Sequence, residues 1–359
     1  MTSYGLRLLA ALLLGFSAFV AIGTLLARTP THPDHGASAS LLLLGDTGKV
    51  HRPLAPLLEG QFSVAADLAA EDRAHPVDAL LLLGDNFYMD GLLEQELAAR
   101  VKLNLVWPYC HFVALGGARS HEVSGVCPPS AADADKRPIY AVLGNHDYES
   151  AESPSLQQDA IPAFVTNWSL STRFAVNREL PNGLSLILLD SHNYRRDGAE
   201  EELAEALTAA KGPWRVLAAH IPMAIGESGN EPEVPDGSLE FQQFVEGAIK
   251  RAGVRVHLYV SGHHHSLQAI TGGGALGPSL HVVAGSGARP RAIAMSHSRR
   301  VFAAEALGFA RLDLVERGEN SRMVVQLFQS PVIPLLRLGF PRIVARWSID
   351  ADGQVSREP

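Results

Sequence analysis

The sequence has few cysteines, no long run of one charge and no internal repeat. Its 359 residues carry a net charge of −8 with both signs interspersed, which argues against a dedicated nucleic-acid surface, so we expect no nucleic-acid partner. Cys110 and Cys127 are the two cysteines, and neither has the spacing of a metal site. With 47% apolar residues, the chain can instead bury one large core.

Both cysteines fall within residues 108–137, a stretch rich in Gly, Pro and Ser that reads as a surface excursion. In an exported protein they could form a disulfide that stabilises the fold by roughly 3 kcal/mol. The alternative is that both thiols are free, and the sequence does not decide between a disulfide and free thiols.

The amino-terminal residues resemble a membrane segment. Residues 8–27 are apolar over about the length needed to cross a bilayer, with one arginine on each side. A cleaved signal usually has a shorter apolar region followed by a small-residue cleavage site. We therefore expect residues 1–28 to be an uncleaved anchor rather than a cleaved signal. Residues 29–40, rich in Pro, His, Gly and Ser, would be a linker. In either case the remainder, 41–359, is expected to be exported to a periplasmic or extracellular location.

Apolar runs alternate with helical patterns over most of the chain. Continuous apolar character indicates strands that are covered on both faces. We expect strands at 41–44, 79–83, 139–143, 184–189, 214–219 and 255–260, and helices at 61–73, 92–105, 200–210 and 239–250. The Pro-Asn-Gly turn at 181–183 predicts a hairpin of 174–177 with 184–189.

The last third changes character, because 280–284, 308–314 and 323–328 suggest antiparallel strands without intervening helices. The predicted fold class is therefore α/β, with two packed mixed β-sheets flanked by helices.

A short phrase recurs where the apolar runs end. It reads Leu-Gly-Asp at 44–46 and 83–85 and Leu-Gly-Asn-His-Asp at 143–147, while two later runs end in Ala219–His220 and in Gly-His-His-His at 262–265. A buried strand that ends in a glycine turn directs the next side chain into the crevice beyond the carboxyl edge of the sheet. Carboxylate, amide and imidazole groups delivered there suit a two-metal hydrolytic site.

The order of these motifs resembles the calcineurin-like metallophosphoesterase superfamily. More narrowly, it resembles the purple acid phosphatases, especially the small tartrate-resistant type, to which Leu-Gly-Asp-Asn-Phe-Tyr at 83–88 is particularly close. The similarity runs from about Leu41 to Leu314. It implies that 41–359 is a catalytic domain with a dimetal site at the strand ends.

One exchange of residues decides between branches of that superfamily. Most members carry Asp-x-His in the first motif, whereas this chain has Gly48 two residues after Asp46. Purple acid phosphatases replace the lost ligand with a tyrosine three residues after the second-motif Asp85, and Tyr88 stands there. Tyrosinate is a hard anionic ligand that favours Fe(III).

The resemblance implies two metal shells. The Fe(III) site would take Asp46, Asp85, Tyr88 and His265, and a second site for divalent Fe, Zn or Mn would take Asp85, Asn145, His220 and His263. Asp85 would bridge the two ions. An extended segment would point His263 and His265 the same way and His264 elsewhere.

We expect hydrolysis of a phosphate monoester by a metal-activated hydroxide. Asn145 and His146 would bind the substrate, and His146 would protonate the leaving alkoxide. Asp147 would orient His146 or a ligand. The tartrate-resistant type has a further histidine nine residues after the fourth-motif histidine, but Gly229 stands there, and Glu227 or Asn230 could substitute.

The expected function is thus an exported, acid phosphatase-like phosphomonoesterase acting on a small phosphorylated substrate and held to the membrane by residues 1–28. A phosphodiesterase or nucleotide pyrophosphatase on the same dimetal core is the second interpretation, since loops outside the motifs select the substrate. A non-catalytic, metal-containing envelope protein is the third.

Overall fold

The computed structural model describes residues 36–49, 54–128, 136–223, 239–272, 277–293, 299–316, 318, 320–332 and 342–358. The expected anchor at 1–28 and most of the expected linker lie outside these residues. Among the helices that are described, none combines the length and apolar character needed to cross a membrane.

The first sheet has eight strands in the order β15-β14-β13-β12-β1-β2-β3-β4. Its parallel half consists of β1 (Ala39–Leu44), β2 (Ala79–Leu82), β3 (Ile139–Ala141) and β4 (Trp168–Leu170). The other half pairs antiparallel and consists of β12 (Gly308–Val315), β13 (Arg322–Gln329), β14 (Arg342–Asp350) and β15 (Val355–Arg357).

The second sheet has seven strands in the order β11-β9-β10-β8-β7-β6-β5. Its parallel strands are β6 (Leu184–Leu189), β7 (Trp214–Ala218), β8 (Leu258–Ser261) and β10 (Leu280–Ala284). The antiparallel strands are β5 (Ala175–Leu180), β9 (Leu267–Thr271) and β11 (Arg300–Ala304). The predicted hairpin is β5 with β6.

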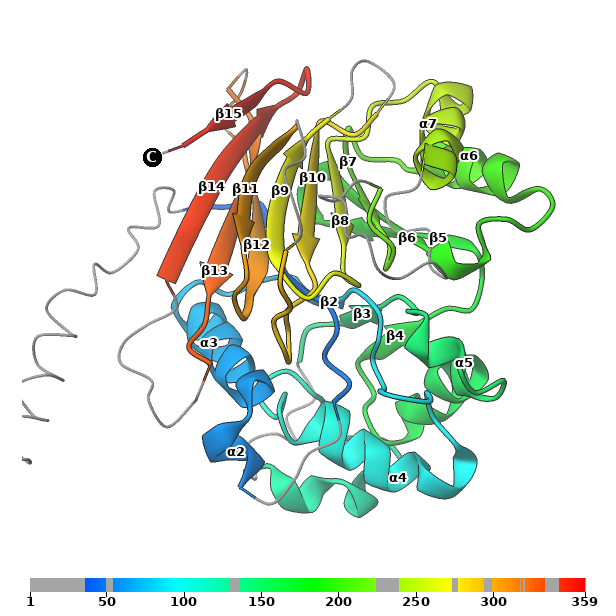
Figure 1. Cartoon of the computed structure of the whole chain (residues 1–359), viewed down its shortest axis with the longest axis vertical. Helices are drawn as coiled ribbons and strands as arrows, with labels where there is room; N and C mark the ends of the chain where they lie inside the picture. The colour runs from blue at the N-terminus through cyan, green and yellow to red at the C-terminus, as the bar shows by residue number, and fades with distance from the viewer. Residues whose placement is uncertain are drawn as a thin grey trace, which may run out of the picture.

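The two sheets pack face to face, and helices cover their outer faces (Figure 1). Alternate residues of each strand point to opposite sides. Leu41 and Leu43 of β1 enter the core between the sheets, whereas Leu42 and Leu44 pack beneath the outer helices. Burial on both faces explains the continuous apolar runs, and the predicted α/β fold of two mixed sheets is confirmed.

The helices follow the same division. The first sheet is covered by α3 (Gly60–Ala74) and α4 (Leu97–Arg100), and the second by α6 (Ala199–Ala209) and α7 (Leu239–Ala252). Two short helices, α2 (Ala55–Leu58) and α5 (Ser153–Ser155), lie in loops.

Three predictions about the elements were wrong. The helix expected over 92–105 is a 3-10 turn at Glu94–Glu96, then α4, then a π-helical turn at Val101–Val106. Buried Asn104 lies in the π-helical turn: its backbone carbonyl accepts a hydrogen bond from Gln61 at 3.2 Å, its side-chain amide donates to the Lys49 carbonyl, and its Oδ1 accepts from Arg100 at 2.8 Å. The last third is not purely antiparallel, since β10 runs parallel to β8. Finally, β1 begins two residues inside the expected linker, at Ala39.

Cys110 and Cys127 form a disulfide with their Cα atoms 5.4 Å apart. It closes a loop within the excursion at 108–137. The sequence left a disulfide and two free thiols as alternatives, and the structure contains the disulfide.

Candidate dimetal centre

The five recurring strand ends meet at one edge of the paired sheets. The loops after β1, β2 and β3 come from the first sheet, and those after β7 and β8 come from the second. Asp46, Asp85 and His263 adopt positive φ angles of 59°, 51° and 64°. Non-glycine residues adopt this conformation uncommonly, and those that do often cluster at active sites.

The first cluster consists of Asp46, Tyr88 and His265. The Tyr88 hydroxyl donates to Asp46 Oδ1 at 2.8 Å and lies 3.0 Å from His265 Nε2. The same His265 nitrogen lies 3.1 Å from Asp46 Oδ1. All three side chains are buried. Three polar atoms therefore form a nearly equilateral triangle within the protein.

The second cluster is centred on His220. Its Nε2 atom lies 3.1 Å from Asn145 Oδ1, 3.1 Å from His263 Nδ1 and 3.4 Å from Asp85 Oδ1. Its Nδ1 atom lies 2.8 Å from the Leu83 carbonyl, so Nδ1–H donates there and Nε2 is left as the basic nitrogen.

Asp85 lies between the two clusters. It interacts with His220 of the second cluster, and its charge acts on Tyr88 of the first. The backbone amide of His146 also donates to Asp85 Oδ1, at 3.0 Å. This is the position expected of a carboxylate shared by two ions.

In the first cluster, nearby carboxylates and histidines shift the pKa values of Tyr88 and Asp46. Burial raises the pKa of Tyr88 well above its usual value, and the Asp46 and Asp85 carboxylates raise it further. Burial alone would also raise the pKa of Asp46, but His265, His220 and His263 together outweigh it and lower that pKa to about 2. Ionising the phenol here therefore requires a strong local cation.

The donor groups fit two metal ions. Metal–ligand bonds of about 2.0–2.2 Å at right angles place neighbouring ligand atoms about 3 Å apart, the spacing found in both clusters. Donor atoms of Asp85, His220 and His263 also lie within 4.8 Å of one another. Oxygen and imidazole donors without thiolate suit hard or borderline ions.

The structure brings all the side chains expected in the two shells to this edge: Asp46, Asp85, Tyr88, Asn145, His220, His263 and His265. The reasoning about His263 and His265 needs correction, because His263 is in a left-handed turn rather than an extended segment. His264 is half-buried, with its ring centroid 6.3 Å from that of His263.

Gly48 and Tyr88 are linked through their backbones. Gly48 donates to the Asp85 carbonyl at 3.0 Å, and its own carbonyl accepts from the Tyr88 amide at 2.9 Å. A Cβ atom at position 48 would overlap the backbone of Asn86 and Phe87. The residue that lacks a ligating side chain therefore lets the two loops approach closely.

His146 lies against the outer side of Tyr88, with ring centroids 4.6 Å apart. Its Nδ1 atom is 2.7 Å from the carbonyl of exposed Met89, so Nδ1–H donates and Nε2 remains for a ligand.

Asp147 fastens two of the ligand loops together. Its buried carboxylate accepts backbone amides of Gly144 at 2.9 Å and of Asn86 and Phe87 at 3.1 Å each. Gln157 donates to it at 2.9 Å. Asp147 thus positions the loops that carry Asn145 and Tyr88, whereas Gln157 carried no signal in the sequence.

Glu227 and Asn230, the expected substitutes for the absent histidine, lie outside the described residues. The sequence also gave no reason to single out Tyr148 and His192, whose rings stack at 4.4 Å in the loops beside His146 and His220.

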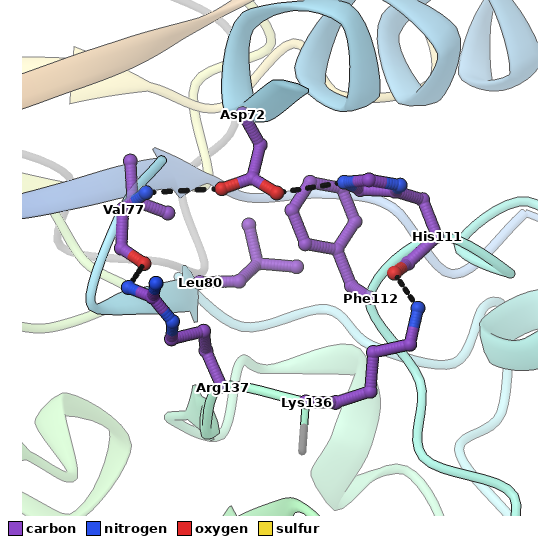
Figure 2. Close-up of a pocket in the computed structure, with 7 residues that line it drawn as sticks. All are labelled: Asp72, Val77, Leu80, His111, Phe112, Lys136 and Arg137. Carbon is purple, nitrogen blue, oxygen red and sulfur yellow. Dashed lines mark hydrogen bonds and ion pairs between the residues drawn. The ribbon is translucent and has the colours of Figure 1, made fainter. Parts of the chain in front are cut away.

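A cavity of about 180 Å³ lies away from this site (Figure 2). Leu80 near the start of β2 and Arg137 just before β3 line it, so it is at the opposite end of these strands. Its lining groups bond to one another: Asp72 pairs with His111 at 2.7 Å and accepts the Val77 amide at 3.0 Å. We assign no ligand to it.

Comparisons with known proteins agree with this geometry. A model of the calcineurin-like phosphoesterases matches residues 39–267. Purple acid phosphatase 3 of Arabidopsis thaliana is 24% identical over 260 residues, which is 65% of this chain and 59% of that protein. The chain therefore spans about three fifths of the length of this relative.

Two solved structures show the same fold. Purple acid phosphatase PPD1 from yellow lupin (Lupinus luteus) seeds has a TM-score of 0.59 at 14% identity, covering 89% of this chain and 55% of that chain. GAP50, the anchor in the inner membrane complex of Plasmodium, has a TM-score of 0.56 at 18% identity, covering 86% and 90%. With the family match extending over more than half of its length, this chain belongs to the calcineurin-like phosphoesterases and resembles the purple acid phosphatases among them.

Proposed function

We propose that the protein is an exported, purple acid phosphatase-like phosphomonoesterase. The observation that carries the proposal is the buried contact of Tyr88 with both Asp46 and His265, beside a Gly48 that offers no ligand. A phenol held between a carboxylate and an imidazole suits a trivalent ion better than Zn²⁺ or Mn²⁺.

In this proposal Asp46, Asp85, Tyr88 and His265 hold Fe(III), and Asp85, Asn145, His220 and His263 hold a divalent ion. When bound, such ions lower the pKa of a coordinated water and neutralise phosphate oxygens. The chain itself fixes the donors. The Leu83 carbonyl orients His220, and Asp147 holds the loops that carry Asn145 and Tyr88.

His146 would act on the leaving group. With Nδ1–H bonded to the Met89 carbonyl, its Nε2 atom is the one that can carry a second proton toward the substrate. Transfer of that proton to the departing alkoxide oxygen would release an alcohol and leave neutral imidazole. Asn145, one residue earlier, would contact the phosphoryl group from the metal side.

Export and membrane attachment are proposed from the amino-terminal sequence and the disulfide. Disulfides persist in oxidising compartments, which fits Cys110–Cys127 in a periplasmic or extracellular domain. The attachment itself would be through residues 1–28.

Two other functions use the same fold. A phosphodiesterase or nucleotide pyrophosphatase would share the donor set and differ in its loops. A non-catalytic envelope protein is suggested by the similarity to the GAP50 anchor, although here every proposed ligand position carries a donor side chain.

Parallel assays separate these three functions. Purified full-length protein, loaded with iron and a divalent metal, is given 4-nitrophenyl phosphate and bis(4-nitrophenyl) phosphate, with Asp85→Asn as the inactive control. Preferred turnover of the monoester supports the proposal, whereas preferred turnover of the diester favours the second function. Metal binding without turnover of either substrate contradicts enzymatic function and favours the third.

A further inference from the structure

The rings of Tyr148 and His192 form a flat pair beside the dimetal centre. Their centroids are 4.4 Å apart and their planes differ by 12°. Tyr148 follows the loop after β3, and His192 follows β6 in the other sheet. His192 is exposed and Tyr148 covers one face of its ring, so the open face, the one left for a ligand, is the face away from Tyr148.

Hydrogen bonds tie the Tyr148 hydroxyl and the backbone of His192 to the same carboxylate. The Tyr148 hydroxyl donates to Asp190 Oδ2 at 2.6 Å, and the backbone amide of His192 donates to the other oxygen of that carboxylate at 3.2 Å. Asn193 donates to both the Tyr148 hydroxyl, at 3.0 Å, and Asp190, at 2.7 Å. One carboxylate thus orients the Tyr148 ring and holds the backbone at His192, and the stack on Tyr148 favours one orientation of the His192 ring, which reduces the side-chain entropy that a ligand would cost.

Backbone contacts place the pair at the rim of the site. Tyr148 donates its amide to the Asn145 carbonyl at 3.1 Å, within the turn that carries His146. Ser191, adjacent to His192, accepts the amide of His220 at 3.2 Å through its side chain. The pair therefore lies between the turns that carry Asn145 and His220.

Electrostatics agree with this placement. Burial lowers the pKa of His192. The carboxylates of Asp190 and Asp85 act in the opposite direction, and His220 lowers the pKa further. Two proposed metal ligands are therefore within electrostatic reach of the His192 ring.

We propose that the open face of His192 is a stacking platform for a planar aromatic leaving group of the substrate. The inference rests on the proposed phosphatase function and defines its substrate class as phosphate esters whose leaving group is a flat ring. Aromatic side chains prefer parallel, offset contact with flat rings, and a saturated ring of similar size cannot make it. The role of His192 is to bind the leaving group, while proton transfer stays with His146.

The test uses two substrates that differ in planarity and release alcohols of similar acidity: benzyl phosphate and cyclohexylmethyl phosphate. With the full-length, metal-loaded protein we expect a KM about 3- to 10-fold lower for benzyl phosphate, with similar kcat. His192→Ala should remove the preference, and His192→Phe should retain it. His121→Ala, which removes an exposed histidine from the turn at Ser120–Glu122, is the matched control.

Binding provides a readout that does not need turnover. Calorimetric titration with benzylphosphonate and cyclohexylmethylphosphonate should show the same 3- to 10-fold preference and the same response to the variants. Equal KM values in the unsubstituted protein, with both substrates hydrolysed, would overturn the platform and leave the phosphatase intact.

His192→Ala and His192→Phe could instead both lose activity and both show a changed pH profile. That result would mean that His192 acts in proton transfer, and the platform would be wrong. If neither substrate were hydrolysed, the proposed function would fail. In that case a His192-dependent preference between the two phosphonates would still support the platform.

Discussion

The amide of Tyr88 donates a hydrogen bond of 2.9 Å to the carbonyl of Gly48. One residue lacks a side chain that could ligate and the other supplies a phenol, and the backbone joins them directly. The space between the two loops leaves no room for a Cβ atom at position 48. The loss of one ligand and the gain of another are thus parts of a single local packing arrangement.

Gly48→Ala should displace the Tyr88 loop. The added methyl group overlaps the backbone of Asn86 and Phe87, which cannot move aside as a flexible side chain would. We expect a loss of about 1–3 kcal/mol in unfolding free energy and reduced iron content, measured by urea denaturation and elemental analysis. Gly125→Ala, where a Cβ atom meets nothing within 4 Å, is the control. Equal stability and iron content in the two variants would contradict the packing argument.

Asp147→Ala should weaken the site without removing a ligand. It leaves the buried amides of Gly144, Asn86 and Phe87 without their acceptor, at a cost of about 1–3 kcal/mol for each amide that finds no other partner. The melting temperature, measured by differential scanning calorimetry, and the metal content should both fall. Asp159→Ala removes an exposed carboxylate from the same half of the protein and should change neither. Unchanged metal content in Asp147→Ala would mean that the ligand loops hold their positions without this carboxylate.

The sequence could predict those parts of the site that follow from local patterns, but not those that depend on contacts between segments distant in the sequence. Asp46, Asp85 and His220 were predictable because each stands within two residues of the end of a continuous apolar run, and parallel strands bring their carboxyl ends to one edge. The stack of Tyr148 on His192 joins the two sheets and leaves no periodic pattern in either segment. In the π-helical turn, Asn104 bonds to Gln61 and Lys49, which are distant in the sequence, and an amphipathic pattern could not reveal such contacts.

Acid should destabilise the fold partly through His257. The pKa of this side chain is lowered from 6.5 to about 4, first by burial and then by the charges of Arg255 and Arg215. Its Nδ1 atom accepts the Arg215 amide at 3.2 Å, an acceptor that imidazolium would lose.

The sign follows from proton uptake. Below pH 6.5 the unfolded chain binds a proton that the folded chain does not bind until about pH 4. Stability is therefore fully present above pH 6.5 and is lost as the pH falls toward 4, by up to about 3 kcal/mol. Urea titrations across this range should show a steeper loss for the unsubstituted protein than for His257→Gln. Parallel curves would show that His257 does not contribute.

Visible absorption of the iron-loaded protein tests most directly whether Tyr88 ligates Fe(III), as we propose. A tyrosinate–Fe(III) pair absorbs in the visible range by charge transfer from the phenolate to the metal. The protein should be pink to violet, and Tyr88→Phe should lose that band while the fold, followed by circular dichroism, is retained. A colourless iron-loaded protein, or a band that survives in Tyr88→Phe, would contradict the assignment.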